Sequence, residues 1–358
     1  MLRYLKKRQL TCTTLLSRTK TLKLKNMNEI SPEKVWSLKE NEFLSLLESG
    51  IFAPKLRQVR FYGPSFTYYK ARHCRFSPTS FPTISITGAS CALNCKHCEG
   101  KVLETMYSAA SAAELFELCS KLKQVGAQGC LVSGGCLPDG SVPIDKFVSA
   151  FGRIKEELGL TIFVHTGIIN LETAIMLKAA GVDAALIDVI GSAETVAKVY
   201  NLKVTLENYA DSLKALSESA LDFVPHIIVG LNEGKLQGEL EALRIIRKVI
   251  PSALVIIAFM PIRGTAMEKV PPPSPVDIAR IVSMARLMFP ETPLVLGCMR
   301  PKGAIRSKTD VLALKAGIDG IAFPNEEAVK YAESNRYKIS FSSYCCAKIY
   351  SDAKEIKK

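Results

Sequence analysis

Short apolar runs alternate with amphipathic stretches from Pro82 onward. The runs are continuous and rich in β-branched residues, which is typical of parallel strands buried on both faces. Between them, apolar residues recur at helical spacing. The predicted strands cover residues 83–87, 129–132, 161–165, 185–189, 223–229, 254–259, 294–297 and 320–323. The predicted helices cover residues 112–125, 145–158, 172–180, 193–200, 209–219, 238–249, 276–288, 309–316 and 326–334.

This repeated alternation predicts an α/β fold, a (β/α)8 TIM-type barrel that is full or slightly open. A doubly wound open sheet is the alternative. We assign residues 82–340 to the barrel and residues 29–81 to an N-terminal lead-in. The lead-in contains one predicted helix over residues 32–47, with Ser31 as its N-cap and Pro32 at its first position. Residues 341–358 form a C-terminal tail that bears a cysteine pair.

The net charge of +13 is uneven along the 358 residues. Residues 1–28 hold eight Lys and Arg and no acid, so the rest of the chain carries only +5. That balance gives no reason to predict nucleic-acid binding. The basic segment has three interpretations: a transit peptide, a disordered arm, or an extension upstream of a usual start at Met27.

Eleven cysteines, an odd number, follow no secretory signal with an apolar core. A disulfide framework is therefore disfavoured, and a reducing compartment is expected. We predict a cytoplasmic protein, or one of an organellar matrix if residues 1–28 are a transit peptide. The most apolar stretch, residues 249–262, is too short to cross a bilayer and contains two prolines.

Three of the cysteines, Cys91, Cys95 and Cys98, follow the first predicted strand with CxxxCxxC spacing. Three thiolates on one loop can bind a [4Fe–4S] cluster and leave one iron open to a small chelating molecule. Structural zinc prefers four ligands, and His97 or Cys74 is available as the fourth. The local pattern thus favours an iron–sulfur cluster and leaves zinc as an alternative.

The cysteine triad after the first barrel strand resembles the radical S-adenosylmethionine (SAM) superfamily. The resemblance implies that the amino and carboxylate groups of SAM chelate the open iron and that reductive cleavage of SAM yields a 5′-deoxyadenosyl radical. His97 stands where the superfamily has an aromatic residue, which implies a place near the adenine. Gly134 and Gly135 stand at a GGE-type turn for the methionine end of SAM, with Cys136 in place of the acid.

Further segments at predicted strand ends resemble the biotin-synthase-like branch of that superfamily, over about residues 80–350. They are VHTG (164–167), DVIG (188–191), VPHIIVGLNEGKLQGE (224–239) and FMPIRGT (259–265). More narrowly, the chain resembles prokaryotic biotin synthase homologues, some of which are thought to form one half of a two-protein lipoyl synthase.

Sulfur-inserting members of that branch carry an auxiliary iron–sulfur cluster, which serves as the sulfur donor. The candidate ligands here are Cys298 after the seventh strand, Cys345 and Cys346 in the tail, and Cys74 before the first strand. Their positions differ from the ligand patterns of authentic biotin synthase and single-chain lipoyl synthase. Cys136 lies near the SAM turn, whereas Cys119 and Cys130 lie within a predicted helix and strand and are expected in the core.

Other polar residues lie at predicted strand ends, where a barrel places its active site. Asp188 is a candidate to bind the ribose hydroxyls of SAM. His165 and His226 are either satisfied barrel histidines or hydrogen-bonding partners of substrate or SAM. Arg263 and Arg300 are candidates to hold a carboxylate, or surface ion pairs. No residue is assigned a catalytic role.

We therefore predict a radical SAM enzyme that inserts sulfur into an unactivated alkyl chain, most simply converting an octanoyl to a lipoyl group. The expected partners are a lipoyl-carrier domain or a small-molecule substrate, a reductant such as ferredoxin or flavodoxin, and a second radical SAM subunit. Nucleic acid and membrane are not expected partners. One rival is a single-cluster radical SAM enzyme, a mutase, methylase or ring-former; another is biotin synthase-like sulfur insertion. A metal-stabilised binding module is the non-enzymatic rival.

Overall fold

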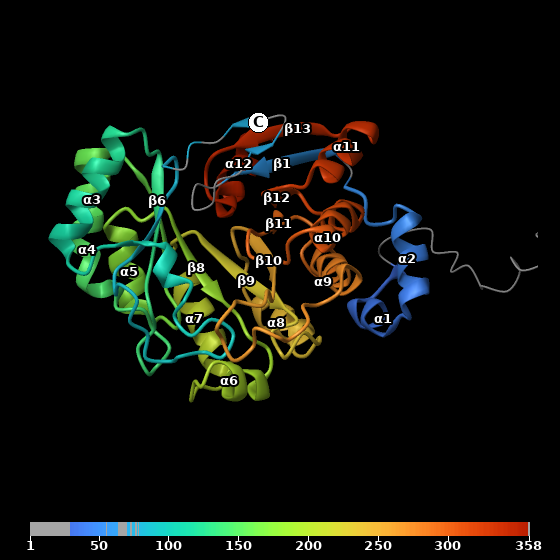
Figure 1. The fold of residues 1–358 in the computed structure, drawn as a ribbon, viewed down its shortest axis with the longest axis horizontal. Coiled ribbons are helices and arrows are strands. Elements are labelled where there is room, and N and C mark those ends of the chain that lie inside the picture. The colour runs from blue at the N-terminus through green and yellow to red at the C-terminus, as the bar shows by residue number, and fades with distance from the viewer. Residues whose placement is uncertain are drawn as a thin grey trace, which may run out of the picture.

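The computed structural model describes residues 29–54, 56–63, 70–71, 74–75, 77 and 79–356, so the predictions for residues 1–28 lie outside it. One curled sheet of eleven strands dominates the described part, in the order β13-β1-β12-β11-β10-β9-β8-β7-β6-β4-β5 (Figure 1). All neighbouring strands in it are parallel. The strands are β1 (Gln58–Tyr62), β4 (Thr83–Ser85), β5 (Tyr107–Ser108), β6 (Gly129–Ser133), β7 (Thr161–His165), β8 (Ala184–Asp188), β9 (Phe223–Val229), β10 (Leu254–Ala258), β11 (Leu294–Leu296), β12 (Gly320–Ala322) and β13 (Lys338–Ser342).

All eight predicted strands are present, each within two residues of its predicted ends. Three strands in this sheet were not predicted. β5 extends one edge, and β1 and β13 extend the other, with β1 lying between β12 and β13. The barrel is therefore not closed: it is a curled half-barrel with edges at β5 and β13, the open form of the predicted architecture. A short antiparallel pair, β2 (Lys70–Ala71) and β3 (Cys74–Arg75), lies outside the sheet.

In the described part of the chain, the two ends of the sheet, near β13 and near β5, are not joined by strand pairing, but side chains connect them. The hydroxyl of Ser343, just after β13, donates to Oε1 of Gln128 over 3.1 Å, just before β6. The rings of Tyr344 and Phe81 lie 5.6 Å apart between the same regions. The residues after β13 thus span the open side of the half-barrel.

The predicted helices are present on the outer side of the sheet (Figure 1). The prediction for residues 145–158 corresponds to three consecutive helical pieces, a 3-10 turn, α4 and a π turn. The helix predicted over residues 309–316 begins five residues earlier, after Gly303. The helices are α3 (Ala112–Gln124), α4 (Val148–Arg153), α5 (Leu171–Ala179), α6 (Ala193–Val199), α7 (Leu206–Glu218), α8 (Glu239–Ile246), α9 (Pro275–Met288), α10 (Ala304–Lys315) and α11 (Glu326–Ser334).

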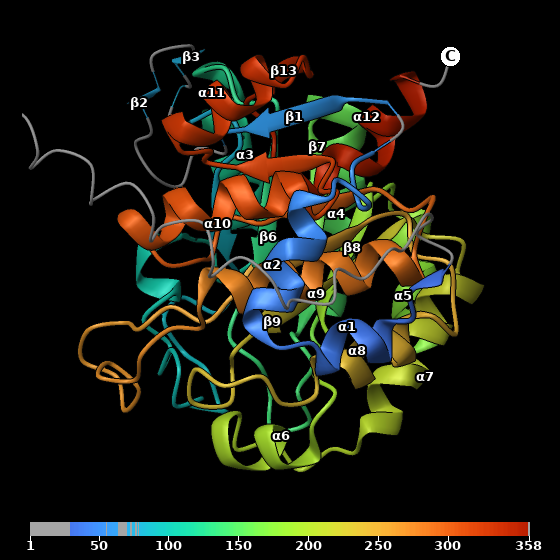
Figure 2. The ribbon, with the colours of Figure 1, turned by 90° about the vertical axis from the view of Figure 1, so that its right-hand side faces the viewer.

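The single helix predicted over residues 32–47 is wrong: two helices, α1 (Pro32–Ser37) and α2 (Glu40–Glu48), occupy this segment. Leu38 and Lys39 have extended backbones, which ends the first helix and begins the second. The predicted cap is confirmed, because the Ser31 side chain accepts from the Lys34 amide. Both helices pack outside α9 (Figure 2), where the Arg280 guanidinium donates to the Val35 carbonyl.

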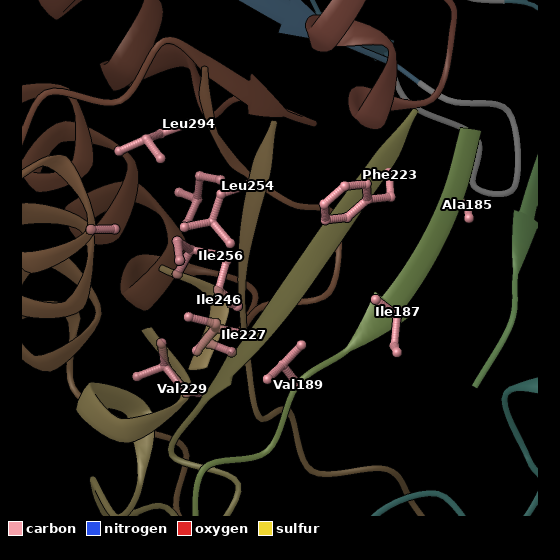
Figure 3. Packing of buried hydrophobic residues seen from close by; sticks show 14 of the residues in the cluster. Ala185, Ile187, Val189, Phe223, Ile227, Val229, Ile246, Leu254, Ile256 and Leu294 are labelled. Atoms are coloured by element: carbon pink, nitrogen blue, oxygen red, sulfur yellow. The ribbon is translucent and has the colours of Figure 1, made fainter. Parts of the chain in front are cut away.

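Alternate residues of the central strands face opposite sides of the sheet. Figure 3 shows the side toward the helices, where Ile187, Ile227 and Ile256 belong to the main apolar core. Their strand neighbours Leu186 and Val255 face the concave side and belong to a second apolar cluster. In the described residues, none of the helices combines the length and hydrophobicity that a bilayer crossing requires.

Candidate functional site

The concave side of the sheet changes from apolar to polar toward the carboxyl ends of the strands. Phe163, Leu186 and Val224 belong to the concave apolar cluster. Two residues further along each strand, on the same face, stand His165, Asp188 and His226 in turn. Because parallel strands end at one edge, this polar layer lies at the end of the barrel where active sites of such folds form.

The cysteine loop, residues 86–102, begins directly after β4 at the same end. A tight backbone path brings its thiols together: the amides of Cys98 and Glu99 both donate to the Cys95 carbonyl, over 3.0 and 2.8 Å. Asn94 and Glu99 adopt left-handed φ values of 46° and 45° to complete it. Cys95 is buried, and Cys91 and Cys98 are half-buried. The hydrogen bond between the Cys95 and Cys98 thiols lowers the pKa of Cys98, with His97 assisting.

The predicted glycine turn after β6 lies against this loop. The Gly135 amide donates to the Thr87 hydroxyl over 2.7 Å, and the Ala92 amide donates to the Cys136 carbonyl over 2.9 Å. A β-carbon at Gly135 would stand 2.0 Å from the Ser90 carbonyl oxygen and 2.6 Å from the Cys91 α-carbon. Only glycine allows the turn to approach the cysteine loop this closely.

The end of α6 and the residues after it form hydrogen bonds with the cysteine loop. The sequence analysis did not predict this contact. The side-chain amide of Asn201 donates from Nδ2 to the carbonyls of Leu93 and Asn94. The backbone amide of Lys96 donates to the Val199 carbonyl. Asn201 itself has a left-handed φ of 53°. Asn201 directly follows the helix predicted over residues 193–200, and Asn is common at helix ends. Its partners Leu93 and Asn94 lie over a hundred residues earlier in the chain, so the contact could not be read from the sequence.

His97 lies between the thiols and the residues after α6. Its ring centroid is 5.1 Å from that of Tyr200. Its Nδ1 is buried and has no hydrogen-bond partner among the described residues. A buried ring nitrogen without a partner is unfavourable in a finished core, and it marks a place where a bound molecule can supply the partner.

His165, Asp188 and His226 lie together in the polar layer. His165 Nε2 is 3.5 Å from Asp188 Oδ1, and the two imidazole centroids are 5.9 Å apart. Burial opposes ionisation of Asp188, but attraction to His165 outweighs it and lowers the pKa of Asp188. Burial likewise opposes protonation of His165, yet Asp188 raises its pKa. Burial lowers the pKa of His226 to about 4.

A second group of thiols lies in the concave interior. Cys298, Cys345 and Cys346 all pack in the concave apolar cluster. The Cys345 and Cys346 thiols share a hydrogen bond that lowers the pKa of Cys345. Burial, together with the nearby Cys345, raises the pKa of Cys298 to about 12. The structure therefore brings together three of the four residues predicted for an auxiliary cluster.

The route of the C-terminal segment explains this meeting. The tail enters the concave side as a 3-10 turn (Cys346–Lys348) and α12 (Ile349–Ile356). The Tyr350 hydroxyl donates to the Asp183 carbonyl over 3.1 Å, and Tyr62 donates to Asp352 over 2.9 Å. Asp352 also pairs with Arg60 at 2.6 Å. These contacts fix the segment that carries the cysteine pair.

The other predicted site residues have simpler environments. Cys119 and Cys130 are buried in the core, as expected. Cys136 is half-buried beside Cys91, whose Sγ lies 4.0 Å from the Cys136 carbonyl oxygen. Cys74 lies in β3, away from the sheet in the strand pairing. Arg263 is exposed on the loop after β10.

Arg300 does not hold an external carboxylate. Its side chain has no exposed surface and forms a two-point ion pair with Asp310 at 2.8 and 3.0 Å. It also donates to the carbonyls of Gly297 and Phe323. Both sides of the guanidinium are thus engaged inside the protein. Of the two interpretations of Arg300, carboxylate binding is wrong, and the ion pair is present but buried rather than at the surface.

The fold is a parallel half-barrel, and a loop with three cysteines follows its strand β4. Residues 85–241, from the end of β4 into α8, match the family model described as the radical SAM superfamily. The chain thus carries a radical SAM domain, and enzymes of this superfamily use a [4Fe–4S] cluster and SAM. Three thiols on one loop, the glycine cradle and the unpartnered His97 nitrogen fit those cofactors.

Curated relatives are named biotin synthase. The protein of Leptospira biflexa is 26% identical over 226 residues, which cover 60% of this chain and 62% of the relative. That of Neorickettsia sennetsu is 25% identical over 264 residues, 70% of this chain and 78% of the relative. The chain therefore spans less than two thirds of the Leptospira protein and about three quarters of the other.

Solved structures show the same fold. Methylornithine synthase (PylB) matches with a TM-score of 0.60 at 17% identity, covering 92% of this chain and 98% of that one. HydG, a maturase of the [FeFe]-hydrogenase, matches with a TM-score of 0.61 at 16% identity, covering 92% and 75%. The chain therefore carries a radical SAM domain in this fold and is similar to proteins named biotin synthase.

Proposed function

We propose that Cys91, Cys95 and Cys98 hold the [4Fe–4S] cluster and that SAM binds beside them against Gly134 and Gly135. The absence of room for a β-carbon at Gly135 supports this placement, because the turn exposes backbone rather than side chain to the loop. His97 supplies a ring face and a free Nδ1 near the adenine, and Asp188 supplies a carboxylate for the ribose hydroxyls. When bound, the cluster and SAM supply a 5′-deoxyadenosyl radical that takes hydrogen from an alkyl carbon.

Cys298, Cys345 and Cys346 are the proposed ligands of an auxiliary cluster, with Cys74 as the remaining candidate. The observation that carries this proposal is that all three cysteines pack in the concave cluster, Cys346 buried and Cys298 and Cys345 half-buried. Two of them are sequence neighbours in the C-terminal segment and one follows β11, so only a specific route of the tail unites them. A cluster held there would supply sulfur for insertion into a C–H bond.

The interior supports an alkyl chain as the substrate. Leu131 and Ile257 are partly buried and pack on the same concave cluster as the thiols. Apolar walls of this kind bind a hydrocarbon chain by excluding water from it. We therefore propose that the enzyme inserts sulfur into an octanoyl chain on a carrier lysine, as a lipoyl synthase does.

This reaction requires partners of defined chemistry. A lipoyl-carrier domain presents the acyl chain, and a low-potential donor such as ferredoxin or flavodoxin supplies electrons. A second radical SAM subunit is a further proposed partner. The proposed compartment is the cytoplasm, in line with the free thiols of the cysteines that the structure describes.

The second candidate is sulfur insertion into a small molecule, as in biotin synthesis. The names of the curated relatives favour it. Both candidate reactions use the proposed cluster ligands Cys298, Cys345 and Cys346, and they differ only in the substrate. Incubation with SAM, a reductant and either the octanoylated carrier domain or dethiobiotin separates them by the mass of the product.

The two proposed sets of cluster ligands are tested with two triple variants, Cys91/Cys95/Cys98→Ala and Cys298/Cys345/Cys346→Ala. After anaerobic reconstitution, each is expected to retain roughly four irons and its own EPR signal, and the wild type roughly eight. Cys119→Ala is the matched control, because it removes a buried thiol from the core. Wild type with only four irons, all lost in the first variant, would leave a single-cluster enzyme instead.

A further inference from the structure

The polar layer contains a set of donors that neither proposed cluster uses. His165, Asp188 and His226 come from β7, β8 and β9, three adjacent parallel strands. One ligand atom from each lies within 4.8 Å of the others. Strand pairing sets this arrangement, because Asp188 is directly opposite His226 in the β8–β9 register.

Two imidazoles and one carboxylate are a ligand set for divalent transition-metal ions. Donors bound to one ion at about 2.1 Å lie roughly 3 Å apart. The 3.5 Å between His165 and Asp188 is close to that spacing, and the third ligand needs a movement on the order of 1 Å, within reach of side-chain rotation. The three side chains lie at the concave surface, with His165 and Asp188 25% and 27% exposed, so an ion can reach them.

A simple ion pair accounts for only part of this arrangement. It explains the contact of His165 with Asp188 but gives no role to His226, whose Nδ1 is buried without a partner among the described residues. The His226 ring lies 5.9 Å from the His165 ring, and the ion pair leaves its Nδ1 without a partner among the described residues. A bound cation uses all three groups at once.

We propose that His165, Asp188 and His226 bind one divalent transition-metal ion on the concave side, separate from the cysteine ligands. The site supplies nitrogen and oxygen ligands, whereas the two proposed cluster sites supply thiolates.

One consequence rests on the proposed function, in which Asp188 binds the ribose of SAM. A carboxylate that ligates an ion is not free to accept hydrogen bonds from ribose in the same geometry. Occupation of the site by a metal ion and binding of SAM therefore exclude one another. Excess divalent metal is expected to inhibit the enzyme by weakening SAM binding.

The test is a titration of the cluster-reconstituted protein with Co²⁺, because its cysteine ligands are then engaged. We expect one equivalent of Co²⁺ with nitrogen and oxygen ligation, visible as d–d absorption without thiolate charge-transfer bands. His165→Ala and His226→Ala should each raise the Kd about tenfold or more. His226→Gln, which keeps side-chain volume, should do the same, and the exposed Asp211→Asn should leave the Kd unchanged.

Absence of the nitrogen–oxygen signal, or a signal that persists in folded His165→Ala and His226→Ala, would overturn the proposal. Circular dichroism of each variant reports whether the fold is intact. Addition of SAM should release the Co²⁺. Binding that depends on both histidines but ignores SAM would uphold the metal site and count against the role of Asp188 in SAM binding, so the two proposals fail separately.

Discussion

Replacing Gly135 with alanine tests the close approach between the glycine turn and the cysteine loop. The added β-carbon would stand 2.0 Å from the Ser90 carbonyl oxygen and 2.7 Å from the Cys91 β-carbon. Contacts of this kind need at least about 3 Å, so the loop must move by roughly 1 Å. The obstructing atoms are backbone and a cluster ligand, which cannot rotate away. Overpacking of this size costs about 1–3 kcal/mol.

Gly152→Ala, in α4, is the matched control. Its β-carbon would meet no atom within 4 Å. We expect Gly135→Ala to weaken SAM binding by roughly tenfold to a hundredfold, since each 1.4 kcal/mol is a factor of ten. Gly152→Ala should stay within a few-fold of the wild type.

The assay is calorimetric titration of SAM into reconstituted protein, with iron content and melting temperature measured alongside. A displaced Cys91 should also reduce the EPR signal of the cluster bound by the loop. If Gly135→Ala binds SAM and iron like the wild type, the turn does not constrain the loop, and the proposed SAM site loses its main support.

Three further predictions concern stability. Burial raises the pKa of Glu239 to about 7 in the folded protein, from its ordinary value of 4.5. Between these two pH values the folded protein keeps the Glu239 proton and the unfolded chain loses it, so the free energy of unfolding should fall as pH rises from about 4.5 to 7. Glu239→Gln should remove this loss and be more stable than the wild type at pH 8 by up to roughly 3 kcal/mol, with little difference at pH 4.5, in urea unfolding. Asp310→Ala leaves the buried Arg300 without its partner and should cost about 3–5 kcal/mol by urea unfolding, where a loss under 1 kcal/mol would contradict a buried pair. Tyr350→Phe removes the hydrogen bond to the Asp183 carbonyl and should cost about 1 kcal/mol, measured as a lower denaturation midpoint; an unchanged midpoint would mean that this bond does not fasten the C-terminal segment.

Most of the sheet could be predicted because its central strands are buried on both faces. Such strands are continuous apolar runs, so β7 and β9 were found with their exact bounds. β1 and β13 were missed because they alternate polar and apolar residues or carry charge, as in QVRFY and KISFS. Their place depends on pairing with each other across more than 270 residues of chain, which local pattern does not record.

The candidate site divides in the same way. The cysteine loop is local: spacing within eight residues, glycines and a preceding strand are enough to predict that Cys91, Cys95 and Cys98 lie together. The pair of glycines could be assigned to a turn, but its contact with the loop depends on pairing of β4 with β6. Arg300 was misjudged because its partner Asp310 becomes a neighbour only when α10 packs against the strand ends.

What the sequence by itself determined is the repeated strand and helix pattern and the chemistry of one loop, because both depend on residues close together along the chain. Only the tertiary structure decided which distant groups meet. It opened the barrel, led the C-terminal segment into the concave side, and thereby placed Cys345 and Cys346 with Cys298. It also aligned His165, Asp188 and His226 on three adjacent strands. The reason is physical: register between parallel strands and the burial of a tail are set by packing over the whole domain, and no short stretch of sequence carries that information.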